Sequence, residues 1–184
     1  MILSSINGTD LTPIQKFRIE LVNDHIKQLS SNIQKLDKFI YLIIEPYEDY
    51  ISFLCQVPGV SRKSAIIILS EIGVDMNQFT STRRLTSWAG LTPSYNQSAG
   101  KKKSVHISRA EVYLKPCFVE VAHAAIKDKN DHYNANKFNK ISKRRGKKRV
   151  YIAIARKILV AAYHMLLTEE IWNPADLAEV ETPV

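Results

Sequence analysis

The sequence predicts a mainly all-α protein in which a long coiled-coil arm precedes a compact helical domain. Near the start of the chain, apolar residues recur at alternating spacings of three and four, which is the pattern of a coiled-coil seam. Two later apolar segments, residues 112–126 and 150–167, show helical spacing. With 184 residues, of which 45% are hydrophobic and 24% charged, the chain can form one soluble globular domain and an appendage.

The arm is predicted over residues 14–49, after a flexible leader at residues 1–13. Thr12 is typical of a helix N-cap, and Pro13 suits the first helical position. The expected seam consists of Ile19, Val22, Ile26, Leu29, Ile33, Leu36, Ile40 and Ile43. Because polar neighbours leave a narrow apolar stripe, we expect the helix to pair with a second chain or with another helical arm. Packing on its own domain is the alternative. Pro46 is expected to kink or end the helix.

The compact domain is predicted over residues 50–174, with a helix-hairpin-helix at residues 53–73 and an acidic tail at residues 175–184. Within the hairpin, a Pro-Gly pair permits a tight turn, and Gly73 ends the second helix. Backbone amides at the start of the second helix would then face a phosphate oxygen without reading base sequence. The residues predicted to make this contact are Gly59, Val60, Ser61, Arg62 and Lys63. A purely structural hairpin is the alternative.

Residues 93–103 place Ser98 beside a small Ala-Gly pair and three consecutive lysines, Lys101, Lys102 and Lys103. A hydroxyl needs a base, a metal or electrostatic help to attack a phosphodiester. Lysines supply the electrostatic part because they neutralise charge on the phosphoryl oxygens, and the glycine lets a strand approach the backbone. The segment is therefore a candidate site for reaction at phosphate. A solvated polar loop is the alternative.

Residues 127–149 form the most basic stretch, and from residue 137 onward they contain no acidic residue. The predicted nucleic-acid contacts are Lys140, Lys143, Arg144, Arg145, Lys147, Lys148 and Arg149. A formal charge of +8 favours a polyanionic partner. Nucleic acid is favoured over an acidic membrane surface, because no basic amphipathic membrane helix is evident. A solvated basic face is the alternative.

Cys55 and Cys117 are the only cysteines, and both lie in apolar sequence. This usage predicts two buried thiols in a reducing compartment. The apolar runs are shorter than a membrane span, and no secretory signal is evident. We therefore expect a cytoplasmic protein that does not contact a membrane.

Four sequence blocks occur in order along the chain. They are Val-Pro-Gly-Val at 57–60, Trp-Ala-Gly-Leu-Thr-Pro at 88–93, Asn-Gln-Ser-Ala-Gly-Lys-Lys-Lys-Ser at 96–104, and the basic segment 142–149 with the apolar run after it. Together they resemble the C-terminal transposase domain of the insertion-sequence transposases related to the pilin-inverting site-specific recombinases. The resemblance covers residues 50–174.

This resemblance implies that Ser98 is the DNA nucleophile and forms a covalent phosphoserine link; Ser104 and Ser108 are the nearest competing serines. Family members join this domain to a coiled-coil arm and to a RuvC-like domain, in which four acidic residues hold magnesium. Some members also use a structured guide RNA. The implied partners are therefore DNA, such an RNA, and a second copy of the chain bound through the arm.

Only a short polar leader precedes the arm, so we expect the RuvC-like domain and its magnesium site to be missing and the isolated chain to be inactive. The leading hypothesis is a fragment of a DNA transposase or site-specific recombinase that carries the serine nucleophile. A noncatalytic dimeric module that binds DNA or RNA is the alternative. A third hypothesis is a dimeric scaffold whose basic face meets acidic proteins.

Overall fold

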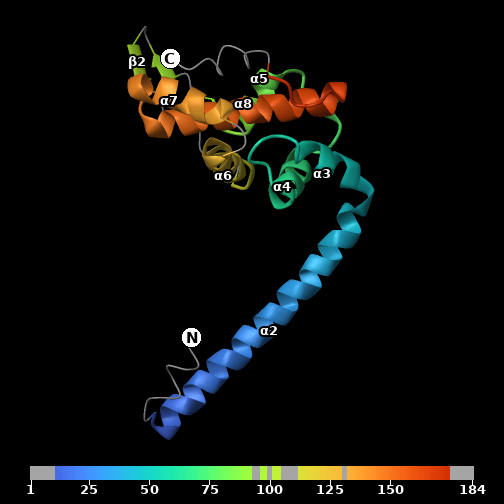
Figure 1. Cartoon of the computed structure of the whole chain (residues 1–184), viewed down its shortest axis with the longest axis vertical. Coiled ribbons are helices and arrows are strands. Elements are labelled where there is room, and N and C mark those ends of the chain that lie inside the picture. Colours follow the sequence, from blue (N-terminus) through green and yellow to red (C-terminus); the bar gives the residue numbers. More distant parts are fainter. Residues whose placement is uncertain (1–10, 93–95, 99–100, 105–111, 130–131, 175–184) are drawn as a thin grey trace. The chain divides into compact units, whose positions relative to one another are not determined.

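A computed structural model describes the protein over residues 11–92, 96–98, 101–104, 112–129 and 132–174. The predicted acidic tail and most of the predicted leader lie outside the described residues. The chain divides into two compact units, Met1–Pro46 and Tyr47–Val184. Figure 1 labels the helices of both units.

Helix α2, Pro13–Ile44, forms the first unit and begins at the predicted cap. The Gln15 amide donates to Thr12 Oγ1 over 3.4 Å, and the Thr12 amide donates to Gln15 Oε1 over 2.9 Å. This capping box satisfies amides that the start of a helix otherwise leaves unpaired. Most of the predicted seam is exposed: Val22, Ile26, Leu29, Ile33, Leu36, Ile40 and Ile43 are 42–61% accessible. The helix is confirmed, and its pairing stays a prediction.

The break predicted at Pro46 is also confirmed. Helix α2 ends at Ile44, and Glu45–Tyr47 forms the short 3₁₀ turn η1. Proline cannot donate the backbone hydrogen bond that would continue an α-helix. A new helix, α3, begins at Glu48.

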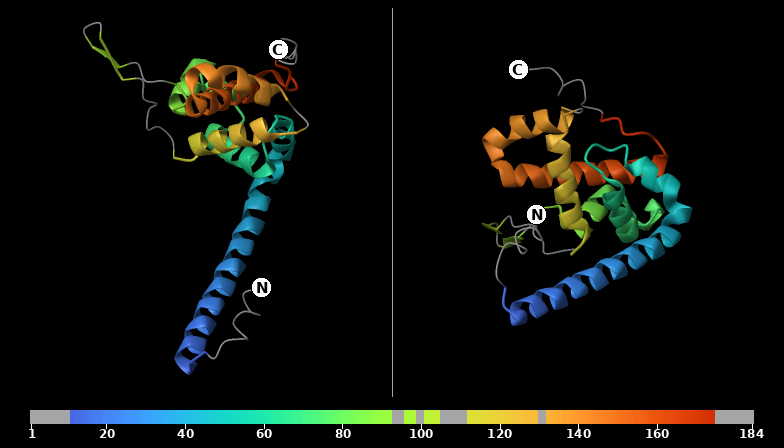
Figure 2. Two further views of the ribbon diagram at one scale, coloured as in Figure 1. Left: turned by 60° about the vertical axis from the view of Figure 1, so that its left-hand side comes forward. Right: turned by 60° about the horizontal axis from the view of Figure 1, so that its bottom comes forward.

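The second unit is a compact helical domain whose longest helix, α8, contacts helices α3, α5, α6 and α7. Both views of Figure 2 show α6, α7 and α8 side by side. The elements in chain order are α3 Glu48–Leu54, α4 Arg62–Ile72, η2 Met76–Gln78, α5 Thr82–Trp88, β1 Asn96–Ser98, β2 Lys101–Ser104, α6 Leu114–Lys127, α7 Tyr133–Arg145 and α8 Lys147–Thr168. The mainly helical fold class is confirmed, with one short two-stranded hairpin added.

The core is built around the apolar positions of α8. Its buried residues are Val150, Ile154, Ala155, Ile158, Leu159, Ala162, Tyr163, Met165 and Leu166. By length and composition alone α8 could cross a membrane, but half of its apolar window is buried inside the protein. Because four neighbouring helices contact α8, it is the central core helix of this unit.

The two cysteines lie in different environments. Cys117 is buried on α6, and its Sγ donates to the backbone oxygen of Ser64 over 3.7 Å. Burial raises the pKa of the Cys117 thiol, which keeps it protonated and unreactive at neutral pH. The prediction that Cys55 is buried was wrong: it is exposed, because it caps the C-terminus of α3 where the chain turns at the surface.

Candidate nucleic-acid interface

Seven basic side chains gather where α7 ends and α8 begins, and we call this surface the basic corner. Its members are Lys140, Lys143, Arg144, Arg145, Lys147, Lys148 and Arg149, and every one of them is exposed. Gly146 makes the turn with a φ of +79°, and a Cβ there would meet nothing within 4 Å. The structure therefore displays all seven residues predicted from this segment on one corner between two helices.

The helix dipole acts differently on the basic residues that end α7 and on those that begin α8. Lys143, Arg144 and Arg145 lie in the last turn of α7, where positive charge is favoured by the helix dipole. Lys147, Lys148 and Arg149 open α8, whose first turn contains no acidic residue. Cations at a helix N-terminus oppose the dipole, and neighbouring like charges repel. A bound polyanion would relieve both costs.

Two further lysines, Lys137 and Lys157, are half-buried and contact one aromatic ring. Tyr133 is only 1% exposed, and Lys137 Nζ donates to its hydroxyl over 3.3 Å. Lys157 Nζ lies 4.6 Å from the centre of the same ring, and Trp172 meets the ring edge-on at 6.1 Å. The cation–π contact of Lys157 with Tyr133 ties α8 to the start of α7, at the other end of α7 from the basic corner.

A cluster of three rings joins α6, α7 and α8 near the basic corner. The rings of His123 and Tyr151 stack with centres 3.7 Å apart and planes 18° apart, and Phe138 lies 5.0 Å from Tyr151. All three residues are half-buried. The cluster could not be predicted from the sequence, because a contact between three helices leaves no signal within any one of them.

The helical hairpin of α3 and α4 places Gly59 against another helix. Gly59 has a φ of +84°, and a Cβ there would lie 2.5 Å from the backbone oxygen of Val121 and 2.6 Å from the backbone nitrogen of Ala125. Only glycine fits both the left-handed conformation and this close approach to α6. The Pro-Gly turn is therefore a packing contact within the domain.

The other predicted contacts of the hairpin are arranged around the start of α4. Val60 is buried, and its amide donates to the Val57 oxygen over 3.0 Å, while Ser61 caps α4 by accepting from the Ser64 amide over 3.2 Å. Lys63 is exposed.

Arg62, also predicted to contact nucleic acid, pairs through both terminal nitrogens with the Glu48 carboxylate, with Nη2 to Oε2 at 2.8 Å. The hydrogen bond from Arg62 holds the pKa of Glu48 below its ordinary value. The pair links α3 to α4.

The predicted serine segment forms an antiparallel hairpin of strands β1 and β2. Its register pairs Ser98 with Lys101 and Gln97 with Lys102, with an irregularity between Asn96 and Gln97. The intervening residues 99–100 lie outside the described residues. The ladder brings the backbones of Ser98 and Lys101 together.

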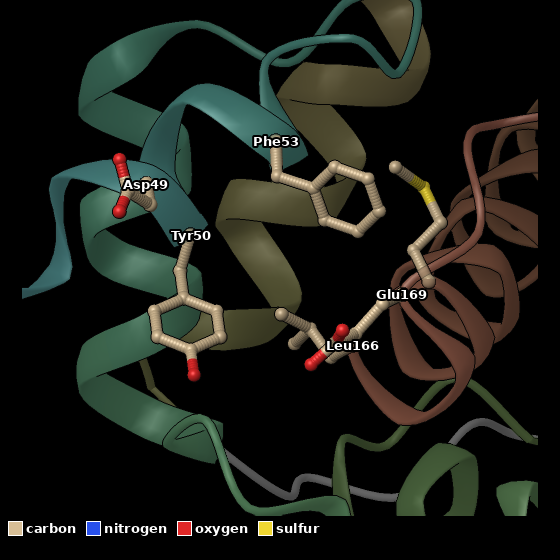
Figure 3. A pocket seen from close by; sticks show the side chains of 6 residues that line it. Asp49, Tyr50, Phe53, Leu166 and Glu169 are labelled. Carbon is tan, nitrogen blue, oxygen red and sulfur yellow. The ribbon is translucent and has the colours of Figure 1, made fainter.

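The pocket of Figure 3 lies near the C-terminal end of α8. It has a volume of about 350 Å³ and is lined by Asp49, Tyr50, Phe53, Met165, Leu166 and Glu169. Two carboxylates on an apolar lining repel phosphate and cannot neutralise it. The charge of this end of α8 is thus opposite to that of the basic corner.

Within the part of the chain that the structure describes, no three His, Cys, Asp or Glu side chains gather closely enough to hold a metal ion. The described residues therefore do not fit the magnesium site that the family resemblance implies for a RuvC-like domain.

Part of the second unit is similar to a known protein family. Residues 51–138 match the model of the Transposase IS116/IS110/IS902 family. This segment runs from α3 to the first half of α7, so it includes the helical hairpin, the serine hairpin and α6.

Particular relatives extend the similarity beyond this segment. The pilin gene-inverting protein of Moraxella lacunata is 32% identical over 152 residues, which cover 78% of this chain and 46% of the relative. Its namesake from Moraxella bovis is 30% identical with the same coverage. The transposase for insertion sequence element IS1111A of Coxiella burnetii is 26% identical over 94% of this chain and 48% of its own length. The chain spans about half the length of these curated relatives, and the matches indicate the class of transposases and site-specific recombinases.

Proposed function

We propose that this chain is the DNA-binding and serine-bearing region of a DNA transposase or site-specific recombinase. The observation that carries the proposal is the basic corner, because seven exposed cations continue directly from the segment that matches a transposase family. Such a surface suits the phosphate backbone, which dominates affinity for nucleic acid. A cytoplasmic location follows from a DNA substrate.

In this proposal Ser98 is the nucleophile. Its Oγ attacks a DNA phosphorus, the new Oγ–P ester replaces one P–O bond to deoxyribose, and the departing sugar oxygen leaves as a hydroxyl. Lys101, Lys102 and Lys103 support the step by stabilising the charge that develops on the phosphoryl oxygens. The register that pairs Ser98 with Lys101 supports this assignment, since it brings both residues to one end of the hairpin.

The involvement of magnesium and of a guide RNA is proposed only from the family resemblance. The described residues offer no cluster of three metal ligands, so we derive no step through magnesium and propose that its acids belong to a RuvC-like domain outside the described residues. We therefore expect the chain alone to bind DNA without exchanging strands. A structured guide RNA, where one is used, would compete for the same cations.

We also propose that two copies pair through α2. In a heptad assignment that places Ile19, Ile26, Ile33 and Ile40 at the a positions, Val22, Leu29, Leu36 and Ile43 occupy the d positions. Isoleucine at a with leucine at d favours a parallel two-stranded coiled coil. The exposure of this seam supports pairing, because large apolar side chains in a continuous stripe gain stability when a partner covers them.

The test of the nucleophile is a covalent adduct in a complete enzyme that contains this chain. A DNA substrate with a nick opposite the reacting phosphate should trap a protein–DNA link that withstands denaturation. Ser98→Ala should abolish both the link and strand exchange while DNA affinity stays unchanged, and Ser104→Ala is the matched control. An adduct that persists in Ser98→Ala, or disappears in Ser104→Ala, would assign the nucleophile to another residue.

A noncatalytic dimeric module that binds DNA or RNA is the second candidate, in which Gly59, Val60, Ser61, Arg62 and Lys63 contribute contacts in addition to those of the basic corner. The pairing of Arg62 with Glu48 and the burial of Val60 favour a structural hairpin over a phosphate clamp. Nucleic-acid binding without any adduct in the complete enzyme would support this candidate.

A further inference from the structure

We propose that the ring cluster of His123, Tyr151 and Phe138 is a docking site for an unpaired nucleobase. The inference rests on the nucleic-acid binding proposed above and specifies the form of nucleic acid. It predicts that the protein prefers strands with accessible base faces, such as single strands or the unpaired positions of a branched junction.

The geometry of the cluster suits a further flat ring. His123 and Tyr151 lie nearly face to face at 3.7 Å, whereas rings that only fill a core prefer offset or tilted pairs at larger separations. Phe138 supports Tyr151 in a tilted contact. Because each residue is half-buried, the stack is fixed by three helices and still reaches solvent. A rigid, partly open stack is the kind of platform on which bases are held.

Cations lie on two of the same helices, within one turn of the rings. Lys147 and Lys148 precede Tyr151 by four and three residues on α8, so they share its side of the helix about 5.4 Å away along the axis. Lys127 follows His123 by four residues on α6, and all three lysines are exposed. Proteins that bind single strands combine such cations for the backbone with aromatic side chains for the bases.

A comparison of single-stranded with duplex DNA distinguishes this site from a basic surface that contacts only phosphates. In a duplex both faces of each base are covered by stacking, so the rings would add nothing to the affinity. An unpaired base gains about 1 to 3 kcal/mol from an aromatic side chain, which corresponds to roughly 5- to 150-fold in affinity. The excess affinity for single strands over that expected from charge therefore measures the contribution of the rings.

The experiment uses the full chain with short oligonucleotides that carry the fluorescent base 2-aminopurine, as single strands and as duplexes. We expect single strands to bind with strong quenching of the probe at one or two positions. His123→Ala should lose at least fivefold in single-strand affinity and most of the quenching, with duplex affinity unchanged. His123→Phe, which keeps a flat ring, should retain both.

His164→Ala is the matched control, since His164 is exposed on α8 and its ring meets Tyr163 edge-on at 5.4 Å. It should behave as the unaltered chain. Equal losses on single strands and duplexes in His123→Ala, or undiminished quenching, would overturn the docking site and leave the proposed function standing. Failure of the unaltered chain to bind any of these oligonucleotides at low salt would overturn both.

Discussion

At the residue scale, Gly59 determines how the helical hairpin meets α6. The sequence predicted that this glycine permits the tight turn of a phosphate-binding hairpin, and the structure shows that the backbone of α6 occupies the space that a Cβ would need. Backbone atoms in the middle of a packed helix cannot move aside for an added methyl group. Gly59 therefore has a packing role irrespective of any nucleic acid.

Replacing this glycine should be costly. Gly59→Ala is expected to lower the free energy of unfolding by about 2 to 5 kcal/mol, because the left-handed conformation and the overpacking against α6 both add to the cost. The measurement is urea unfolding of the whole chain followed by circular dichroism. Gly146→Ala is the matched control, since its φ is also positive but its Cβ meets nothing, so only about 1 to 3 kcal/mol should be lost there through backbone strain. Equal losses in the two variants would show that α6 does not restrict residue 59.

At the element scale, α2 carries the apolar seam that should pair two chains. Ile33→Asp places a charge at a central a position, where a coiled coil would have to bury it, so we expect the dimer to dissociate. Sedimentation equilibrium measures the change in mass. Ser31→Asp introduces the same charge on the opposite side of the helix and should remain a dimer. A monomeric unaltered chain, or a dimer in both variants, would exclude pairing through this seam.

Helix α8 shows a conflict between stability and binding at its N-terminus. Replacing Lys147 and Lys148 with Gln should raise the free energy of unfolding by about 0.3 to 1 kcal/mol per charge, because these cations oppose the helix dipole. The same double variant should weaken DNA binding and reduce its salt dependence by about two phosphate contacts. Thermal unfolding at low salt and binding measurements on one preparation test both effects.

The matched control for that experiment removes equal charge elsewhere. Lys35 and Lys38 are exposed in the C-terminal half of α2, away from its last turn. Changing both to Gln should leave stability and DNA binding nearly unchanged. Destabilisation of the double variant at Lys147 and Lys148 would show that these cations do not oppose the helix dipole. Unchanged DNA binding would show that the corner is an ordinary solvated face.

At the scale of the whole molecule, charge is distributed unevenly along the central helix. The basic corner lies at the start of α8, and the pocket with Asp49 and Glu169 lies at its other end. Twenty-two residues of α-helix separate these ends by about 33 Å. A polyanion is therefore expected to meet the second unit at the α7–α8 end.

Much of this fold could be predicted from the sequence, because caps, glycines and apolar spacing are local signals. Thr12 and Pro13 correctly predicted the start of α2, and Gly73 the end of α4. The serine hairpin was missed because its strands are short and polar, without the alternation of apolar residues that indicates a strand. The contacts of Gly59 with α6 and the ring cluster were also missed, since both depend on residues distant in sequence.

Only part of the candidate site could be predicted from the sequence. The run of cations without acidic residues is exposed in the structure, because charged side chains remain in water unless they are paired. Its contact with nucleic acid stays a prediction. The pairing of Arg62 with Glu48 joins two helices and could not be read from the run of residues around either one. The role of Ser98 stays a prediction that rests on family resemblance and on its place in the hairpin.

The most direct test of the account is the salt dependence of DNA binding by the unaltered chain. If the basic corner neutralises about six phosphates, the binding constant should fall roughly a thousandfold between about 50 and 200 mM salt. Changing Arg144, Arg145, Lys147 and Lys148 together to Gln should remove most of that dependence. Feeble binding at low salt, or an undiminished slope in the altered chain, would contradict the claim that this corner is the nucleic-acid interface.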